Sequence, residues 1–141
     1  ASANPGGTGY SVGTYGKLYN YHAVQNEQEL CPTNWRVPML DDWLTLADNF
    51  GGQSSSADAL KSTSMGGSNE SGFNGLPAGY RSHLTGSYFG LNSGGYWWTS
   101  SSSNIDGSAN YVLLNSGTGL GIDSWDFNVG MSVRCIQNTE E

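Results

Sequence analysis

The residues best suited to chemistry lie between positions 99 and 128. This stretch holds seven Ser, four Asn, four Gly, three Asp and two Thr, and it has no Lys, Arg, Glu, Gln, His, Pro, Met or Cys. Adaptable polar side chains beside aromatic rings are typical of a surface used for recognition. Trp125 and Phe127 stand two apart between short polar residues, so we interpret them as exposed anchors for a partner. The alternative is that they close a small satellite core.

The stretch therefore predicts a ligand-binding face. Its candidate residues are Ser102, Ser103, Asn104, Asp106, Asn110, Asn115, Ser116, Thr118, Asp123, Ser124, Trp125, Asp126, Phe127 and Asn128. Tyr111 is a weaker candidate because it sits in an apolar group typical of a strand core. The acidic members favour a target with some positive potential.

Patterns for catalysis are sparse. His22 and His83 have no partner at metal-ligand spacing, and the chain has neither a Gly-x-Ser-x-Gly elbow nor a phosphate loop. A glycosidase needs two carboxylates held a few ångströms apart, and only Asp106, Asp123 and Asp126 offer them within the polar stretch. We therefore expect no enzymatic activity and no catalytic residue.

Two short segments offer oxygen atoms of the kind that bind a metal ion. Calcium prefers carboxylate, amide and carbonyl oxygens, which Asn69-Glu70 and residues 123–128 offer without EF-hand spacing. Asn and Asp in loops more often form turns with their own backbone. We expect no cofactor and no metal ligand, with structural calcium as the alternative.

Composition limits the class of partner. The formal net charge is −7, and the five basic residues are scattered, which disfavours nucleic acid and anionic lipid. No apolar run approaches the length of a membrane span, so we expect no membrane insertion. Aromatic residues make up 12% of the chain and must supply much of the core.

The elements that would position these residues follow an α+β plan in one domain, with helices early and a turn-rich antiparallel β region after them. Residues 1–9 are expected to be a flexible leader too small and polar to pack, residues 10–137 the domain, and residues 138–141 a tail. Residues 13–21 predict a strand or hairpin. Helices are expected at 23–30, 39–50 and 56–62, and strands at 73–76, 88–91, 96–98, 111–114 and 129–136.

The scaffold residues can be assigned from the same patterns. We expect Trp35, Trp43, Leu44, Leu76 and Val133 to be fixed in the core. Trp97 and Trp98 are adjacent, so in a strand they face opposite sides, and one is expected in the core while the other supports a surface.

Cys31 and Cys135 are the only cysteines, too far apart for a redox or zinc motif. One interpretation is two buried free thiols. The other is a disulfide that ties the first third of the chain to the last strand, which would require an oxidising compartment. We predict the disulfide if the protein is exported.

Several motifs together resemble a known family. They are Tyr15-Gly16-Lys17-Leu18-Tyr19-Asn20-Tyr21, Cys31-Pro32-Thr33-Asn34-Trp35-Arg36-Val37-Pro38, Asp42-Trp43-Leu44-Thr45-Leu46, Ala59-Leu60-Lys61-Ser62, Gly72-Phe73-Asn74-Gly75-Leu76-Pro77-Ala78-Gly79-Tyr80-Arg81, Tyr96-Trp97-Trp98-Thr99-Ser100 and Gly130-Met131-Ser132-Val133-Arg134-Cys135. In order and spacing they resemble the Fibrobacter succinogenes major paralogous domain, over residues 13–136. The resemblance implies a C-type lectin-like fold on secreted or surface proteins of bacteria, or on related phage proteins.

Many members of this group are variable proteins of diversity-generating retroelements, in which error-prone copying changes adenines in Asn-type codons near the C-terminus. Residues 96–135 match that location. Ser, Asn, Asp, Gly and Tyr are reachable from such codons, whereas Lys, Glu, Gln and Met are not, in agreement with residues 99–128. Trp125 is not reachable and would have to be fixed in the template.

Three departures from related patterns matter. Met39 stands where family helices often have a Ser cap, so a weaker cap is expected. Neither cysteine sits in a pair like that of the formylglycine-generating enzymes, which removes their activity from the expectation. No Glu-Pro-Asn or Gln-Pro-Asp tripeptide of the calcium-dependent lectins occurs.

The sequence thus predicts an extracellular, cell-surface or virion display domain with a hypervariable face that binds a protein receptor or surface ligand. The alternative is a carbohydrate-binding or adhesin module with a fixed site, whose partner is a glycan.

Overall fold

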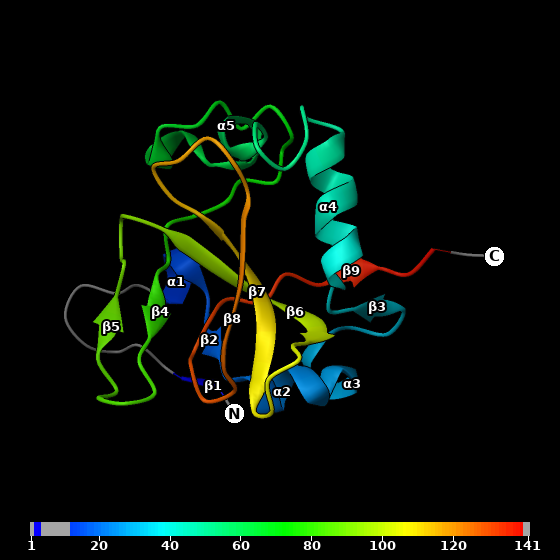
Figure 1. The fold of residues 1–141 in the computed structure, drawn as a ribbon, viewed down its shortest axis with the longest axis vertical. Coiled ribbons are helices and arrows are strands. Elements are labelled where there is room, and N and C mark those ends of the chain that lie inside the picture. Colours follow the sequence, from blue (N-terminus) through cyan, green and yellow to red (C-terminus); the bar gives the residue numbers. More distant parts are fainter. Residues whose placement is uncertain (1, 4–11, 140–141) are drawn as a thin grey trace.

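The computed structural model describes residues 2–3 and 12–139 (Figure 1). At its centre is an antiparallel sheet of three strands, β6 (Gly95–Ser102), β7 (Ser108–Leu114) and β8 (Gly121–Asp126), in the order β6-β7-β8. Trp97 pairs with Val112, which pairs with Ile122. The next row is Trp98, Tyr111 and Asp123. Because successive residues face opposite sides, these two rows belong to different faces of the sheet.

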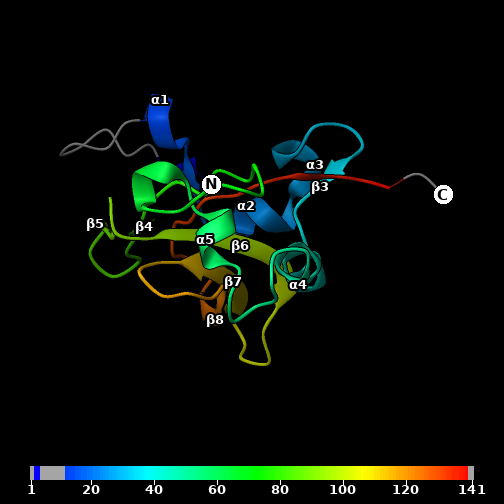
Figure 2. The same ribbon diagram turned by 90° about the horizontal axis from the view of Figure 1, so that it is seen from above.

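Short elements surround this sheet. The helices are α1 (Val12–Tyr15), α2 (Tyr21–Gln25), α3 (Glu27–Leu30), α4 (Leu40–Asp48), α5 (Ala57–Leu60) and a 3-10 turn at Thr63–Met65. Three strand pairs are β1 (Ser2–Ala3) with β2 (Leu18–Tyr19), β3 (Trp35–Arg36) with β9 (Ile136–Gln137), and β4 (Tyr80–Arg81) with β5 (Tyr88–Phe89). Seen from above, α1 to α3 lie on one side of β6, and β7 and β8 lie on the other (Figure 2). The architecture is mixed α+β, with short helices early and antiparallel strands after them.

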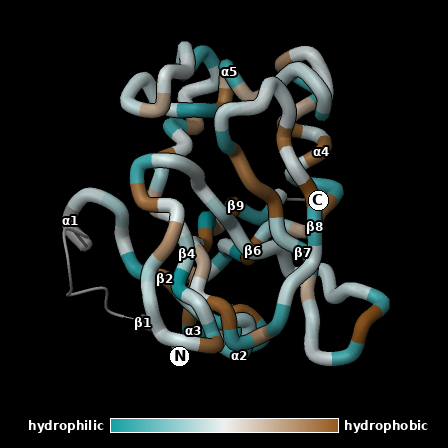
Figure 3. The backbone as a smooth tube through the Cα atoms, turned by 60° about the vertical axis from the view of Figure 1, so that its left-hand side comes forward, coloured by the Kyte–Doolittle hydropathy of each residue, from teal (hydrophilic) through white to brown (hydrophobic). Residues whose placement is uncertain are grey.

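One face of the central sheet is covered by helices. Trp97, Val112 and Leu114 pack there against Trp43 and Ala47 of α4, and Ala57 and Leu60 of α5 join the same buried cluster. We call it the helix-covered face. Hydrophobic residues, brown in Figure 3, gather along α4 and in the strand near the β7 label, while the loops around α5 are mostly white or teal.

The opposite face is covered only in part. Trp98, Ala109 and Tyr111 pack there with Tyr21 and Val24 of α2, and Tyr80 of the β4–β5 hairpin packs on Tyr96 and Trp125. We call it the hairpin-covered face. Trp97 and Trp98 are therefore both core residues. The expectation that only one of them is buried was wrong, because the sheet is packed on both sides.

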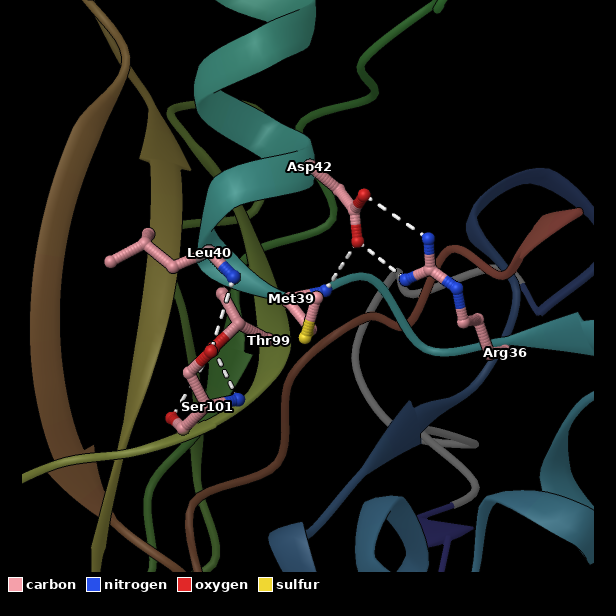
Figure 4. A network of polar contacts seen from close by, with 6 residues as sticks. All are labelled: Arg36, Met39, Leu40, Asp42, Thr99 and Ser101. Carbon is pink, nitrogen blue, oxygen red and sulfur yellow. Dashed lines mark hydrogen bonds and ion pairs between the residues drawn. The ribbon is translucent and has the colours of Figure 1, made fainter. Parts of the chain in front are cut away.

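Helix α4 is held at its N-terminus by two side chains (Figure 4). Asp42 accepts a hydrogen bond from the Met39 N–H at 2.8 Å. Its two carboxylate oxygens also accept hydrogen bonds from the Arg36 guanidinium. The Leu40 N–H, which has no partner inside the helix, donates to Ser101 Oγ of β6 at 3.1 Å. The side-chain cap that Met39 cannot provide is thus replaced by a serine from the sheet, which ties the helix start to a strand.

The disulfide between Cys31 and Cys135 is present, with 5.9 Å between the two Cα atoms and a sequence separation of 104 residues. It joins the segment after α3 to the segment before β9. Closing so long a loop stabilises the fold by about 4–5 kcal/mol in the chain-entropy model. Such a bond indicates an oxidising, extracellular environment.

The helices were predicted more accurately than the first strand. The helix expected at 39–50 is α4, the one at 56–62 is α5, and the one at 23–30 is split into α2 and α3. Of residues 13–21, only Leu18 and Tyr19 form the expected strand, as β2, because α1 ends at Tyr15 before Gly16 with a φ of 77° and Asn20 Oδ1 caps α2 by accepting from the Ala23 N–H. In the expected leader, Ser2–Ala3 pair with β2, and residues 1 and 4–9 lie outside the described part.

Two predicted strands are replaced by extended connections. Residues 73–76 make a single bridge, between Gly75 and Lys61. Residues 129–136 touch three partners in turn, with Gly130 bridging Arg81, Met131 bridging Tyr19 and Ser132 bridging Trp97. Because these residues each pair with a different neighbouring segment, they form no continuous ladder of strand hydrogen bonds. Val129 and Met131 are nevertheless buried, as they would be in a strand.

Trp35 is not a core residue, contrary to expectation. It is 42% exposed on β3, where it pairs with Gln137 in a two-stranded sheet. Trp43 is fully buried, whereas Leu44, Leu76 and Val133 are partly buried. The apolar residue type predicted burial, but a two-residue strand at the periphery leaves the Trp35 indole largely open to solvent.

Candidate ligand-binding face

The expected binding segment carries part of the fold. Residues 99–128 complete β6, form β7 and form β8, so the stretch that was expected as a ligand-binding face also supplies the central sheet. Thr99, Ala109, Val112, Leu114 and Leu120 are fully buried. Strand β8 was expected as a loop, and it exists because its backbone pairs with β7 over six consecutive positions.

The candidate residues fall at two ends of β7 (Figure 1). One group comprises the β6–β7 turn, Asn110 and residues 124–128. Asp126 pairs with Ser108, Ser124 pairs with Asn110, and the Phe127 N–H donates to Gly107 O at 2.8 Å. Asn115, Ser116 and Thr118 lie at the other end, in the β7–β8 loop beside α5. Asp123 lies between the two ends, on β8.

The loop with Asn115, Ser116 and Thr118 is docked on the helical side. Thr118 O accepts from the Ala57 N–H at 3.0 Å, and Lys61 Nζ donates to Asn115 O at 3.0 Å. The Leu120 N–H donates to Gln53 O at 2.8 Å. These three candidates are therefore separated from the rest, and the structure does not bring all the predicted residues into one site.

Several candidate side chains organise turns. Ser103 Oγ accepts from the Ile105 N–H and lies 3.1 Å from Ser108 O, to which it donates. Asp126 Oδ1 accepts from the Asn128 N–H at 2.8 Å, and Asp123 Oδ1 accepts from the Ser124 N–H at 2.8 Å. Asn69 Oδ1 likewise accepts from the Asn74 N–H. Of the oxygens considered for calcium, Asp126 Oδ1 thus makes an Asx turn, and Asp123 Oδ1 and Asn69 Oδ1 accept from other nearby backbone N–H groups.

The two expected anchors are packed against neighbouring rings. Trp125 is partly buried, with its ring 4.9 Å from Tyr80 and 6.1 Å from Tyr111. Phe127 lies 4.8 Å from Tyr21 and 5.8 Å from His22, and it is also partly buried. Phe127 follows the satellite-core alternative. Both residues, however, pack against a main buried cluster that includes Trp98 and Tyr111, and Trp125 lies at its edge, on the outer strand of the sheet.

Trp125 belongs to an aromatic cluster on the hairpin-covered face. We define this cluster as Tyr80, Phe89, Tyr96, Tyr111 and Trp125. Tyr80 is its hub, with ring distances of 5.1 Å to Tyr96 and 5.7 Å to Phe89. Tyr111 is 7% exposed at the base, whereas Phe89 is 46% exposed at the rim.

Sequence reasoning missed three members of the aromatic cluster as site residues, namely Tyr80, Phe89 and Tyr96. For Tyr96 the sequence did hold a signal, because it lies two residues before Trp98 and a strand places both side chains on the same face. Nothing local indicates that Tyr80 packs against Trp125 of β8 or that Phe89 packs against Tyr80, since both contacts depend on where the β4–β5 hairpin lies.

The aromatic cluster has an acidic border. Asp123 is exposed and pairs with Tyr111 across the strands, so its carboxylate lies on the same face. Burial, followed by the negative charge of Asp123, raises the pKa of Tyr111 to about 12. Burial also raises the pKa of Tyr96. Both phenols are therefore neutral near pH 7, when their hydroxyl groups can donate and accept hydrogen bonds.

A second polar contact links the hairpin to the end of β8. His83 Nε2 lies 3.9 Å from Asp126 Oδ2. The hydrogen bond from the Asn128 N–H is the main cause that lowers the pKa of Asp126, and His83 and His22 contribute to the same direction. This contact fixes the hairpin at the end of the sheet next to the β6–β7 turn.

This face offers aromatic rings for stacking and polar side chains for hydrogen bonding. Among the described residues, no group of three or more His, Cys, Asp or Glu side chains is placed to hold a metal ion. In the same part of the chain, every helix is too short or too polar to cross a bilayer.

One protein family matches most of the chain. The family model described as the Fibrobacter succinogenes major domain matches residues 4–137, which includes the central sheet, the hairpin and the disulfide. No curated protein and no solved structure matches the sequence. Because the match covers nearly the full length, the chain belongs to the Fibrobacter succinogenes major domain family.

Proposed function

We propose that this protein is a non-enzymatic ligand-binding domain with a C-type lectin-like fold, displayed on an extracellular surface such as a cell or a virion. The observation that carries the proposal is the aromatic cluster at the edge of a rigid sheet, with exposed Asp123 beside it. Aromatic rings bordered by polar groups are the usual energetic centre of protein interfaces. The favoured ligand is a protein receptor rather than a nucleic acid or a lipid.

The binding face combines the aromatic cluster with the turn residues nearest to it. These are the β6–β7 turn and residues 124–128, which lie together at one end of the sheet. Asn115, Ser116 and Thr118 are left out because they lie beside α5 at the opposite end. The proposed face is therefore narrower than the one the sequence predicts.

We further assign this face to the hypervariable type produced by diversity-generating retroelements. In residues 99–128, buried and exposed positions alternate or cluster in loops, so the outer side chains can change while the inner ones are kept. Asn104, Asp106, Asp123 and Asn128 are exposed, whereas Val112 and Leu114 are fully buried. This arrangement supports variation without loss of the fold.

Sequencing of the native locus tests the hypervariable assignment. We expect a nearby reverse-transcriptase gene and a near-identical DNA repeat of the segment that encodes residues 96–135. In a population, substitutions should gather at the exposed positions named above and spare Val112 and Leu114. A locus without a repeat, or substitutions spread evenly over buried and exposed positions, would contradict hypervariability.

A carbohydrate-binding or adhesin module is the second candidate, because a half-exposed indole beside a carboxylate also suits a sugar ring. A glycan array measured with and without calcium separates the two functions. Binding of one glycan class that is lost in Trp125→Ala would favour the carbohydrate module. Peptide or protein ligands lost in the same variant would favour the receptor-binding domain.

A further inference from the structure

The strands that carry four of the five rings of the aromatic cluster hold no Lys and no Arg. From Ser82 to Val133 the sequence has no Lys and no Arg, and its acidic residues are Asp106, Asp123 and Asp126. This span includes β5 to β8, and hence four of the five rings of the cluster. A ligand that approaches this face therefore meets carboxylates and aromatic rings but no basic side chain from these strands.

The chain's own cations are engaged elsewhere. Four of the five basic side chains are hydrogen-bonded within the domain: Arg36 to Asp42, Lys61 to Asn115 O, Arg81 to Gly86 O, and Arg134 to Phe73 O. The fifth, Lys17, lies beside β2 next to Tyr15 and Ala78. With a net charge of −7, the excess of acid is left for solvent or for a partner.

Asp123 is the carboxylate best placed to act with the rings. It lies two residues from Trp125 on β8, so both side chains leave the sheet on the same face. One of its oxygens, Oδ1, accepts from the Ser124 N–H, and the side chain as a whole is exposed. The effect of its charge on Tyr111 agrees with a position beside the aromatic cluster.

Building on the function proposed above, we propose that this face recognises an arginine side chain presented by a protein partner. The guanidinium pairs with the Asp123 carboxylate while its plane stacks on a ring of the aromatic cluster, either the partly buried Trp125 or the exposed Phe89. Arginine fits better than lysine because its guanidinium is planar, weakly hydrated and suited to both aromatic faces and carboxylates. A phosphate-bearing or other anionic ligand is disfavoured by the same carboxylates.

The test is selection of peptides from a phage-displayed random library on the intact wild-type domain. We expect the selected peptides to share an arginine. Replacing that arginine with citrulline, which keeps the shape and removes the charge, should weaken binding at least tenfold. Affinity should also fall as NaCl is raised.

Matched variants locate the contact. Asp123→Asn keeps the oxygen that accepts from the Ser124 N–H and removes the charge, so we expect it to weaken the arginine peptides about tenfold. Asp48→Asn makes the same change of charge at the end of α4, on the opposite side of the sheet, and should leave affinity unchanged. Trp125→Ala should abolish binding. If it unfolds by circular dichroism, Phe89→Ala at the exposed rim replaces it.

Three results would contradict arginine recognition or the proposed binding face. Peptides lost in Trp125→Ala or Phe89→Ala, but without arginine or insensitive to Asp123→Asn, would refute arginine recognition and leave the proposed binding face in place. Equal weakening by Asp48→Asn would show a general charge effect and also refute it. Peptides indifferent to all the variants on the face would refute the proposed function itself.

Discussion

The two faces of the central sheet use the same strands but are packed to different extents. On the helix-covered face, Trp97, Val112 and Leu114 are buried against α4 and α5. On the hairpin-covered face, Tyr96 and Trp125 are only partly buried, and Asp123 is exposed. Because side chains alternate along a strand, neighbouring residues can serve stability and recognition separately. The incompletely covered face is therefore the one to which we assign the proposed binding.

The largest effect is expected on the helix-covered face. Trp43→Ala should lower the free energy of unfolding by about 3–5 kcal/mol, because the indole is fully buried between Phe73 and Trp97. Urea denaturation measures this loss. Trp35→Ala, which removes an exposed indole, is the control and should cost about 1 kcal/mol or less. Equal losses in the two variants would break the distinction between core and surface tryptophans.

A smaller loss is expected on the hairpin-covered face. Trp125→Ala removes two ring contacts at a partly buried position, so we expect a loss of about 1–3 kcal/mol in the free energy of unfolding. A double-mutant cycle with Tyr80→Ala should give a coupling of about 0.5–1.5 kcal/mol. A loss as large as that of Trp43→Ala would mean that both faces are equally part of the core.

The start of α4 adds a pH-dependent contribution to the helix-covered face. The hydrogen bonds from Arg36 are the main cause that lowers the pKa of Asp42 in the folded protein. Its contribution is therefore present above the ordinary Asp pKa and is lost as the pH falls through the lowered value. Asp42→Asn should cost about 1–3 kcal/mol at pH 7.

Urea denaturation at pH 7 and at pH 2 checks this prediction. The difference between wild type and Asp42→Asn should shrink at the lower pH, where the wild-type carboxyl is protonated. Asp41→Asn, in the same helical turn but exposed, is the matched control and should change stability less at both pH values. A difference that does not depend on pH would show that Asp42 acts through its shape and not its charge.

The smallest effects are expected in the polar turns. Asn104→Ala and Ser116→Ala are exposed changes at opposite ends of β7, and each should shift the free energy of unfolding by about 0.5 kcal/mol or less. Ser103→Ala should cost about 1 kcal/mol, because the Ser103 hydroxyl holds the β6–β7 turn. Thermal unfolding of the three variants would measure this, and a comparable loss at Asn104 or Ser116 would argue against tolerance in the loops.

Local patterns in the sequence were enough for several parts of the fold. Helix α4 follows from the spacing of Trp43, Ala47 and their neighbours on one face, and β6 and β7 follow from their aromatic and branched residues. The family follows from the order of motifs along the chain. The disulfide was one of two open interpretations of Cys31 and Cys135, and the structure confirms it.

What the sequence did not determine depends on contacts between distant segments. Strand β8 is polar and reads as a loop, yet pairing with β7 makes it a strand. The sequence pattern placed Trp35 in the core, but its indole is exposed. It placed Trp125 on the surface, but its indole is partly buried against Tyr80. The candidate binding residues lie within one stretch of sequence, but tertiary structure separates Asn115, Ser116 and Thr118 from the others and brings Tyr80 beside Trp125. Residue type and spacing fix which side chains can be buried, whereas only the pairing of strands and the reach of the hairpin decide which of them share a face.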